Sequence, residues 1–344
     1  MRTYSFHEVL DHILLARSFT KTKFDVIGLP DVTLLFTFLR GKPRRLLRPV
    51  IVIYQHILFV LSLVRASRTH DLIIAREFLS VPLICVALLA APARKKICFI
   101  VNHNLQKALT LKTQRFALTL LCRMNFKFVF LEGMDGLEKL GVPIRREQFF
   151  YLPNVVVPVA PGTAPTSRQK RRVGAIGEYR PEKGIAKLIP YLIALQQHAD
   201  IDIMLGSSNS AELEKALDCI VNTIEIVDTS TPEAYAKALS SCDVVILNYS
   251  YDNYYYRSSG VIVNAIECGA NIVCPDYPVF RKQVLNPIQI GALFTDESEI
   301  FDAITSVLAQ RDALCRNIEA YAAARTPQAV ARHIDEFAKI NRLI

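Results

Sequence analysis

Short apolar runs alternate with longer, partly polar segments along most of this chain. The predicted strands of the first half lie at 24–27, 72–74, 97–101 and 128–130, and the predicted helices at 50–66, 79–91 and 105–123. Near-continuous apolar strands separated by helices are typical of a parallel sheet that is covered on both faces. The pattern therefore predicts an α/β domain with a parallel sheet.

The same alternation continues in the second half. Strands are expected at 173–177, 203–206, 243–247 and 271–274, each followed by a loop or a helix. Between the halves, residues 156–170 are rich in Pro, Thr, Ser and Gly, which indicates a linker. A chain of 344 residues also suits two domains better than one core. We predict domains over 1–155 and 171–325, with a C-terminal helix over 326–344 that packs back toward the first domain.

Composition favours a reduced, cytoplasmic protein. Half of the residues (51%) are hydrophobic, and the eight cysteines are scattered without a CxxC pair. We interpret them as buried thiols that form neither disulfides nor a zinc site. Residues 1–15 lack a charged stretch followed by an unbroken apolar run, so no cleaved signal is expected.

Charge is unevenly distributed. Residues 1–155 contain 23 Lys and Arg against 10 Asp and Glu, whereas the remainder contains 18 against 22. Arg44, Arg45 and Arg48 directly precede the apolar segment 50–64, and cations beside apolar surface favour anionic lipid. A merely solvated basic face is the alternative, and no nucleic-acid motif accompanies the charge. The apolar segments 50–64 and 79–93 are shorter than the ~20 residues that a membrane span needs, so we predict a peripheral contact and no nucleic-acid partner.

Two cations follow the strand at 173–177. The strand ends in Gly177, and Arg180 and Lys183 lie in the loop that leads to Gly184 and an apolar helix. Cations at such a loop can meet a bound phosphate. A Lys-Gly pair is also common at ordinary helix starts, so alone it is weak evidence.

A second candidate anion site follows the strand at 243–247. Ser258, Ser259 and Gly260 open a predicted helix, and the free N–H groups of a helix start attract anions. Glu267 lies about two turns further on, at ~1.5 Å per residue, an offset that suits a carboxylate holding a ribose. The alternative is an ordinary serine-capped helix.

His103 is the candidate functional residue of the first half. It stands between Asn102 and Asn104, directly after the strand at 97–101. Ligand crevices of open parallel sheets lie beyond the carboxyl ends of their strands, so His103 and Asn104 should face such a crevice. A lone histidine is more often structural, and the two flanking asparagines favour function.

Together these features resemble the GT-B glycosyltransferases of group 1. The resemblance covers about 173–294 well and the first half more loosely, where Gly141-Val142-Pro143 and later Pro153-Asn154 look like the family's crossing between domains. Its motifs here are Ile176-Gly177, Lys183-Gly184, the strand 203–206 ending in Gly206, the strand 244–248, the stretch 258–269, and Ile272-Val273.

The resemblance implies two Rossmann-like domains and a retaining transfer of a hexose from a nucleotide sugar, without metal or other cofactor. Arg180 and Lys183 would then stabilise the leaving diphosphate, and His103 would lie beside the donor sugar. The implied donor-binding residues are Gly177, Ser258, Ser259, Gly260, Glu267 and Asn104. With the basic first half, this implies a lipid-linked saccharide acceptor and a peripheral place on the inner face of the cell membrane.

Three departures from the family pattern stand out. Ser259 occupies the position where the family has its first glutamate. Glu178 occupies the position of a family arginine, a role that Arg180 would take over. A helix-like segment at 5–18 stands where the family usually has its first strand and a glycine-rich loop. Ser259 therefore leaves open a non-catalytic scaffold or partner subunit of the same fold. An oxidoreductase is disfavoured because no predicted strand is followed by GxGxxG.

Overall fold

The computed structural model describes residues 42–69, 73–75, 80–133, 135–157, 170–198, 200–217 and 224–340. They form two compact units. The N-terminal unit contains residues 42–131, 136–152 and 332–340, and the C-terminal unit contains 132–135 and 153–331. The strand predicted at 24–27, the helix-like segment at 5–18 and linker residues 158–169 lie outside the described residues.

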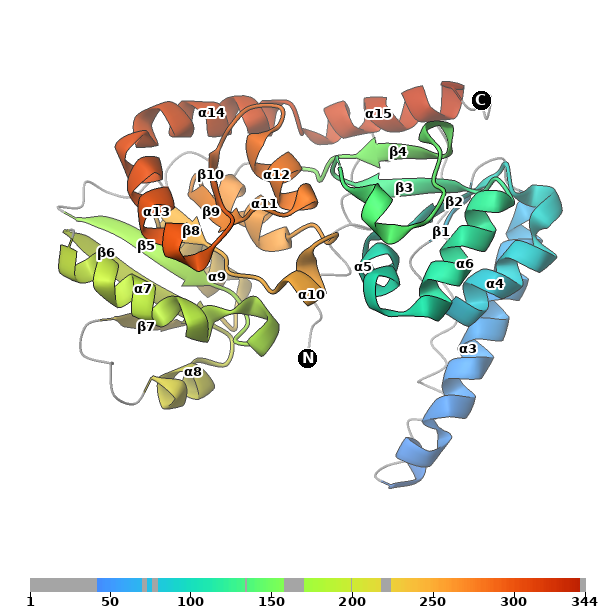
Figure 1. Cartoon of the computed structure of the whole chain (residues 1–344), viewed down its shortest axis with the longest axis horizontal. Coiled ribbons are helices and arrows are strands. Elements are labelled where there is room, and N and C mark those ends of the chain that lie inside the picture. Colours follow the sequence, from blue (N-terminus) through green and yellow to red (C-terminus); the bar gives the residue numbers. More distant parts are fainter. Residues whose placement is uncertain are drawn as a thin grey trace. The chain divides into compact units, whose positions relative to one another are not determined.

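The N-terminal unit is built on a four-stranded sheet in the order β1-β2-β3-β4, with every pair parallel. The strands are β1 (Ile73–Ala75), β2 (Ile97–Ile100), β3 (Lys127–Leu131) and β4 (Phe149–Leu152). The helices are α3 (Lys42–Thr69), α4 (Ser80–Leu89), α5 (Asn102–Thr110) and α6 (Lys112–Arg123), coloured blue to green in Figure 1. The parallel sheet and the first three of these strands confirm the prediction.

The single helix predicted over 105–123 is wrong, because α5 and α6 are separate helices. Leu111 between them has extended backbone, with ψ at 111°. The break is stabilised by Arg115, whose Nε donates to the carbonyl of Ala108 and whose Nη2 donates to that of Leu109, both at 3.2 Å. These bonds satisfy carbonyl groups that the end of α5 leaves without helical partners.

The C-terminal unit has a six-stranded parallel sheet in the order β10-β9-β8-β5-β6-β7. Its strands are β5 (Arg171–Ile176), β6 (Ile201–Ser207), β7 (Glu225–Asp228), β8 (Val244–Ile246), β9 (Asn271–Pro275) and β10 (Gly291–Phe294). Its helices are α7 (Ile185–His198), α8 (Ser210–Ala216), α9 (Pro232–Ser240), α10 (Tyr251–Tyr254), α11 (Gly260–Glu267), α12 (Pro278–Leu285), α13 (Ile300–Ala309), α14 (Arg311–Ala323) and the start of α15 (Pro327–Ile340). This strand order is that of the doubly wound Rossmann fold.

Each face of this sheet has its own core. On one face, side chains of α7 such as Leu188 and Leu192 pack with Ile304 of α13 against β5, β6 and β8. On the other face, Ile262 of α11 and Phe280 of α12 pack with residues of α9 and α14. Helices that cover both faces explain why the strands read as continuous apolar runs.

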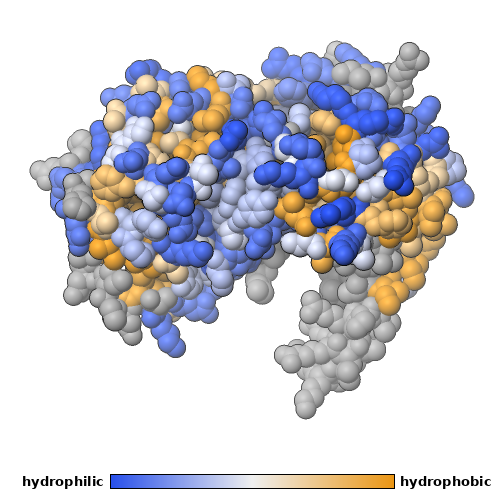
Figure 2. Space-filling view, in the orientation of Figure 1, coloured by the Kyte–Doolittle hydropathy of each residue, from blue (hydrophilic) through white to orange (hydrophobic). Residues whose placement is uncertain are grey.

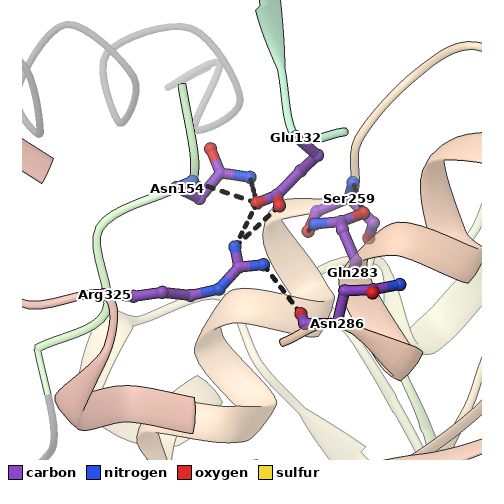
Figure 3. Close-up of polar contacts among 6 residues, drawn as sticks. All are labelled: Glu132, Asn154, Ser259, Gln283, Asn286 and Arg325. Carbon is purple, nitrogen blue, oxygen red and sulfur yellow. Dashed lines mark hydrogen bonds and ion pairs between the residues drawn. The ribbon is translucent and has the colours of Figure 1, made fainter. Parts of the chain in front are cut away.

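A buried ion pair stabilises the C-terminal unit. Nη1 of Arg325 lies 2.6 and 2.7 Å from the two carboxylate oxygens of Glu132, and Nη2 donates to the carbonyl of Asn286 at 3.1 Å (Figure 3). Oε1 of Glu132 also accepts from the backbone and side-chain nitrogens of Asn154, at 3.0 and 2.9 Å. The side chains of Glu132 and Arg325 are only 1% and 6% exposed. No sequence motif indicated this network, which joins residues 193 positions apart.

The seven cysteines of the described residues are all free, which agrees with the predicted absence of disulfides in that part of the chain. Burial raises the pKa of the Cys98 and Cys122 thiols to about 12. Thiols protonated to this degree are poor nucleophiles and poor metal ligands at neutral pH. Among the described residues, no helix combines the length and the apolar character that a membrane span requires.

Candidate functional site

The candidate site lies at the carboxyl ends of β5 and β8, where the order of the sheet reverses. β5 pairs with β6 on one side and with β8 on the other. The connection after β5 leads to α7 on one face, whereas that after β8 leads to α11 on the opposite face. Loops that diverge in this way open a crevice at the switch point of the sheet, and such crevices bind ligands in open α/β folds.

Gly184 lets the loop after β5 come close to the loop after β8. Gly184 has a φ of 64°, and a Cβ at this position would collide with the carbonyl oxygen of Asn248. The amide of Ser250 donates to the carbonyl of Glu182 at 2.9 Å, which fastens the two loops together. The glycine of the Lys-Gly pair is therefore required by the close approach of two backbone segments, and this approach fixes the position of Lys183 directly before it.

Lys183 is the clearest candidate for an anion-binding residue. Its Nζ lies 5.7 Å from the centre of the Tyr249 ring, and a Cβ added to Gly177 would stand 3.3 Å from the same Nζ. The side chain is half-buried, and burial lowers the pKa of the ammonium group. Within the described part of the chain, no carboxylate forms an ion pair with it. A desolvated cation without such a partner is suited to an anionic ligand.

Arg180 is placed differently. Its Nη2 lies 2.6 Å from Oε2 of Glu178, and its Nη1 lies 3.8 Å from Oε1 of Glu182. The hydrogen bond to Glu178 is the main reason why the pKa of Arg180 is raised. Its charge is therefore already balanced within the loop, so a phosphate would have to compete with two carboxylates for the guanidinium group.

The predicted helix start after β8 is present as α11, which begins at Gly260. Ser259 precedes it, and its backbone N–H donates to Oε1 of Gln283 at 3.0 Å while Nε2 of Gln283 donates back to the Ser259 carbonyl at 3.3 Å (Figure 3). Ser259 is 3% exposed, and among the described residues no group meets the distance and angle of a hydrogen bond to its Oγ. The hydroxyl nevertheless lies near that of Tyr249, where it lowers the pKa of the phenol and so opposes the rise that burial causes. Ser258 is half-buried and Gly260 exposed, so these two remain accessible to a ligand.

Glu267 is the last residue of α11 and lies at the end opposite Ser259. Its Oε1 accepts a hydrogen bond from the backbone N–H of Val157 at 2.9 Å. The carboxylate thus contacts the segment that enters the C-terminal unit. This contact is a structural role that the sequence did not indicate, and ribose binding by Glu267 stays a prediction.

His103 and Asn104 lie in the N-terminal unit, in the first turn of α5 directly beyond β2. His103 is half-buried and Asn104 is almost wholly buried. The predicted place after a strand end is therefore confirmed for both residues, while their contact with a donor stays a prediction. Arg44, Arg45 and Arg48 lie in the first turns of α3, and their side chains are outside the described structure.

The sequence did not single out the aromatic and cationic residues between β8 and α11. The rings of Tyr249 and Tyr254 lie 4.2 Å apart, and Cζ of Arg257 lies 4.6 Å from the centre of the Tyr254 ring. The run of tyrosines from 249 to 256, followed by an arginine, is the sequence signal that could have indicated them. The described residues contain no cluster of three or more His, Cys, Asp or Glu that could hold a metal ion.

Comparison with known proteins identifies the fold. No protein-family model matches the chain, and no curated protein matches it. Among solved structures, HepE of Anabaena in complex with UDP-glucose is similar with a TM-score of 0.58 and 17% identity, over 89% of this chain and 90% of HepE. TarM is similar with a TM-score of 0.58 and 16% identity, over 82% of this chain and 58% of TarM.

The lipopolysaccharide outer core galactosyltransferase WaaB is also similar, with a TM-score of 0.57 and 12% identity over 84% of this chain and 81% of WaaB. These neighbours have the GT-B fold. This chain therefore has the GT-B fold with two Rossmann-like parallel sheets, which confirms the predicted fold class.

Proposed function

We propose that this GT-B protein is a glycosyltransferase that moves a hexose from a nucleotide sugar to a membrane-held, lipid-linked saccharide. The observation that carries the proposal is Lys183, a desolvated ammonium group at the switch point of the sheet that has no carboxylate partner among the described residues. The similar structure of HepE, solved with UDP-glucose and with UDP and glucose, gives the expected ligand class.

In the proposed reaction, the bond between C1 of the sugar and the distal phosphate oxygen breaks, and its electron pair leaves with the diphosphate. The acceptor hydroxyl bonds to C1 on the same face, so the configuration is retained, and its proton passes to the departing diphosphate. Lys183 and the start of α11 stabilise the negative charge that develops on the diphosphate. Such electrostatic stabilisation of the transition state is usually the largest single contribution to an enzyme's rate enhancement. His103 positions the sugar, and side-chain cations take the role that a metal ion has in other transferases.

A panel of nucleotides and nucleotide sugars, screened by thermal shift, tests the proposal. We expect one nucleoside diphosphate and its sugar conjugates to raise the melting temperature, because a ligand that binds only the folded state stabilises it. Transfer of the identified sugar to an extracted lipid-linked acceptor then tests catalysis. Binding without transfer would favour the scaffold alternative, and the absence of any nucleotide binding would overturn the proposal.

Glu267 provides a separate prediction for the ribose. In Glu267→Gln the Oε1 that accepts from Val157 is kept while the charge is lost, so the melting temperature should change by less than about 3 °C. Nucleotide binding should weaken several-fold if the carboxylate holds the ribose hydroxyls. Calorimetric titration measures this. An unchanged affinity would leave the contact with Val157 as the residue's role.

The membrane part of the proposal rests on the N-terminal unit. Large apolar side chains are exposed along α3 and α4, with Leu61 57% and Leu88 63% exposed, and Figure 2 shows this apolar surface on α3. The exposed cations Arg65 and Arg68 lie on the same helix as Leu61, and Arg94 follows α4. Exposed apolar side chains beside cations fit the interface of an anionic bilayer. We place the protein on the inner face of the cell membrane, in the cytoplasm.

Vesicle sedimentation tests this surface. The wild type should bind vesicles of anionic lipid at low salt and dissociate as salt screens the charges, over a Debye length of ~8 Å at physiological ionic strength. Replacing Ile57 and Leu61 together by Gln should weaken binding at least ~10-fold, since each buried side chain contributes ~1.5–3 kcal/mol. Replacing Arg65 and Arg68 by Glu should abolish vesicle binding. Replacing Arg44, Arg45 and Arg48 by Glu should have the same effect.

The matched control is Val157→Gln, which removes a somewhat less exposed apolar side chain (45%) from the C-terminal unit. This variant should bind vesicles like the wild type. Wild-type protein that stays in the supernatant at low salt would contradict the membrane assignment, while leaving the nucleotide site untouched.

A further inference from the structure

Arg257 is a second cation at the candidate site, and no carboxylate among the described residues pairs with it. It lies between α10 and α11, three residues before the first residue of α11, and its side chain is half-buried. Its contacts are the Tyr254 ring, 4.6 Å from Cζ, and the Asn253 carbonyl, 3.5 Å from Nη1. Within the described residues, no carboxylate forms an ion pair with this guanidinium group.

Lys183 and Arg257 border the same pair of tyrosines. The Tyr249 ring lies 5.7 Å from Nζ of Lys183, and the Tyr254 ring lies against Arg257 and 4.2 Å from the Tyr249 ring. Both cations also act on the Tyr254 phenol, where they oppose the rise in its pKa that burial causes. Burial raises the pKa of Tyr249 to about 12, so neither phenol supplies a negative charge at neutral pH.

The acidic residues nearby do not balance these two cations. Glu178 and Glu182 influence Lys183 through space, yet both carboxylates pair with Arg180. Asp276 pairs with Arg281 on α12. Arg180 also acts on Lys183 through space, but its own charge is paired with these two carboxylates. Lys183 lies near one ring of the tyrosine pair and Arg257 near the other, so an anion of at least two charges that contacted both cations would be stabilised by each of them.

We propose that Arg257 and Lys183 together bind the diphosphate of the nucleotide sugar, and that Arg257, rather than Arg180, is the second phosphate-binding cation. This inference rests on the proposed function. An arginine can donate two parallel hydrogen bonds to a phosphate, whereas a lysine acts as a point charge. The Tyr254 ring lies 4.6 Å from Cζ of Arg257. Arg257 precedes the start of α11 by three residues, and among the described residues the buried Ser259 hydroxyl next to that start has no hydrogen-bond partner within bonding geometry.

Titration with inorganic pyrophosphate and with UDP tests the inference, because pyrophosphate contains the diphosphate without base or sugar. Arg257→Gln should weaken both ligands about 10- to 100-fold, as expected for a lost charge-assisted contact, and should reduce the salt dependence of binding. Arg257→Lys should recover part of the affinity. Arg180→Gln should change affinity less than about twofold, because Glu178 and Glu182 already occupy that guanidinium group.

The matched control is Arg281→Gln, which removes an exposed arginine that pairs with Asp276, and it should bind both ligands like the wild type. Circular dichroism and thermal unfolding check that each variant is folded. Equal affinity of folded Arg257→Gln and wild type, or a larger loss in Arg180→Gln, would overturn the inference alone. A wild type that binds neither UDP nor pyrophosphate would overturn the proposed function and this inference with it.

Discussion

Replacing Lys183 by Met should strongly weaken nucleotide binding and, at the same time, raise the melting temperature of the ligand-free protein. The loss of a charge-assisted contact of ~1.5–3 kcal/mol lowers nucleotide affinity about 10- to 150-fold. The gain in stability has a separate cause, because the wild type keeps an ammonium group half-buried with no carboxylate partner in the described part of the chain. Each kcal/mol relieved raises the melting temperature by about 2–4 °C in a unit of this size.

The same substitution has a pH dependence of known sign. Burial lowers the pKa of Lys183 in the folded protein, so between that pKa and the ordinary value near 10.4 the unfolded chain binds more protons. Wild-type stability therefore rises with pH across this window, and the advantage of Lys183→Met shrinks. Nucleotide affinity of the wild type should fall over the same window as the ammonium group loses its proton.

Thermal unfolding with and without UDP, at several pH values, measures both effects. Lys187→Met is the matched control, since Lys187 is exposed on the same loop-helix connection, and it should change neither quantity. A Lys183→Met protein that melts earlier than the wild type and is still stabilised by UDP would show that Lys183 is a structural residue.

The sequence could predict those features of the site that depend on the conformation of the backbone. Gly184 marks the close approach of two loops, Gly177 leaves room for the Lys183 ammonium group, and Lys183 directly precedes Gly184. Ser259 and Gly260 were expected to open a helix after β8, and α11 begins there. Strand ends, glycines and helix starts follow local rules, so they can be recognised in one chain.

The partners of charged side chains could not be predicted in the same way. Arg180 and Arg257 each stand in a loop before a helix. Only Arg180 has a glutamate two residues before it and another two residues after it, and in the structure it pairs with both. Glu267 has the offset expected for ribose binding, and it also contacts Val157, 110 residues away, which the sequence did not indicate. Such contacts depend on which elements the fold brings together, and hydrophobic periodicity carries no information about that.

The Glu132–Arg325 pair is the extreme case, and it should dominate the stability of the C-terminal unit. Arg325→Met leaves the Glu132 carboxylate buried with only Asn154 to bond it, and an uncompensated buried charge destabilises by ~3–5 kcal/mol. The melting temperature of this unit should fall by roughly 6–20 °C. Asp135→Asn is the control, because it removes the exposed pair with Lys282 (3.1 Å), and exposed pairs contribute less than ~1 kcal/mol.

Adding Glu132→Leu to Arg325→Met should restore most of the lost stability, because it removes the buried charge that the single variant leaves behind. Glu132 also has a φ of 67°, a left-handed conformation that its hydrogen bonds to Asn154 and Arg325 hold in place. If the buried charge of Glu132 destabilises the single variant, the double variant regains most of the free energy of unfolding. If the destabilisation comes from the strained backbone of Glu132, the double variant stays as unstable as the single variant. Urea unfolding of the four proteins separates these outcomes, and an Arg325→Met protein within 1 kcal/mol of the wild type would contradict both.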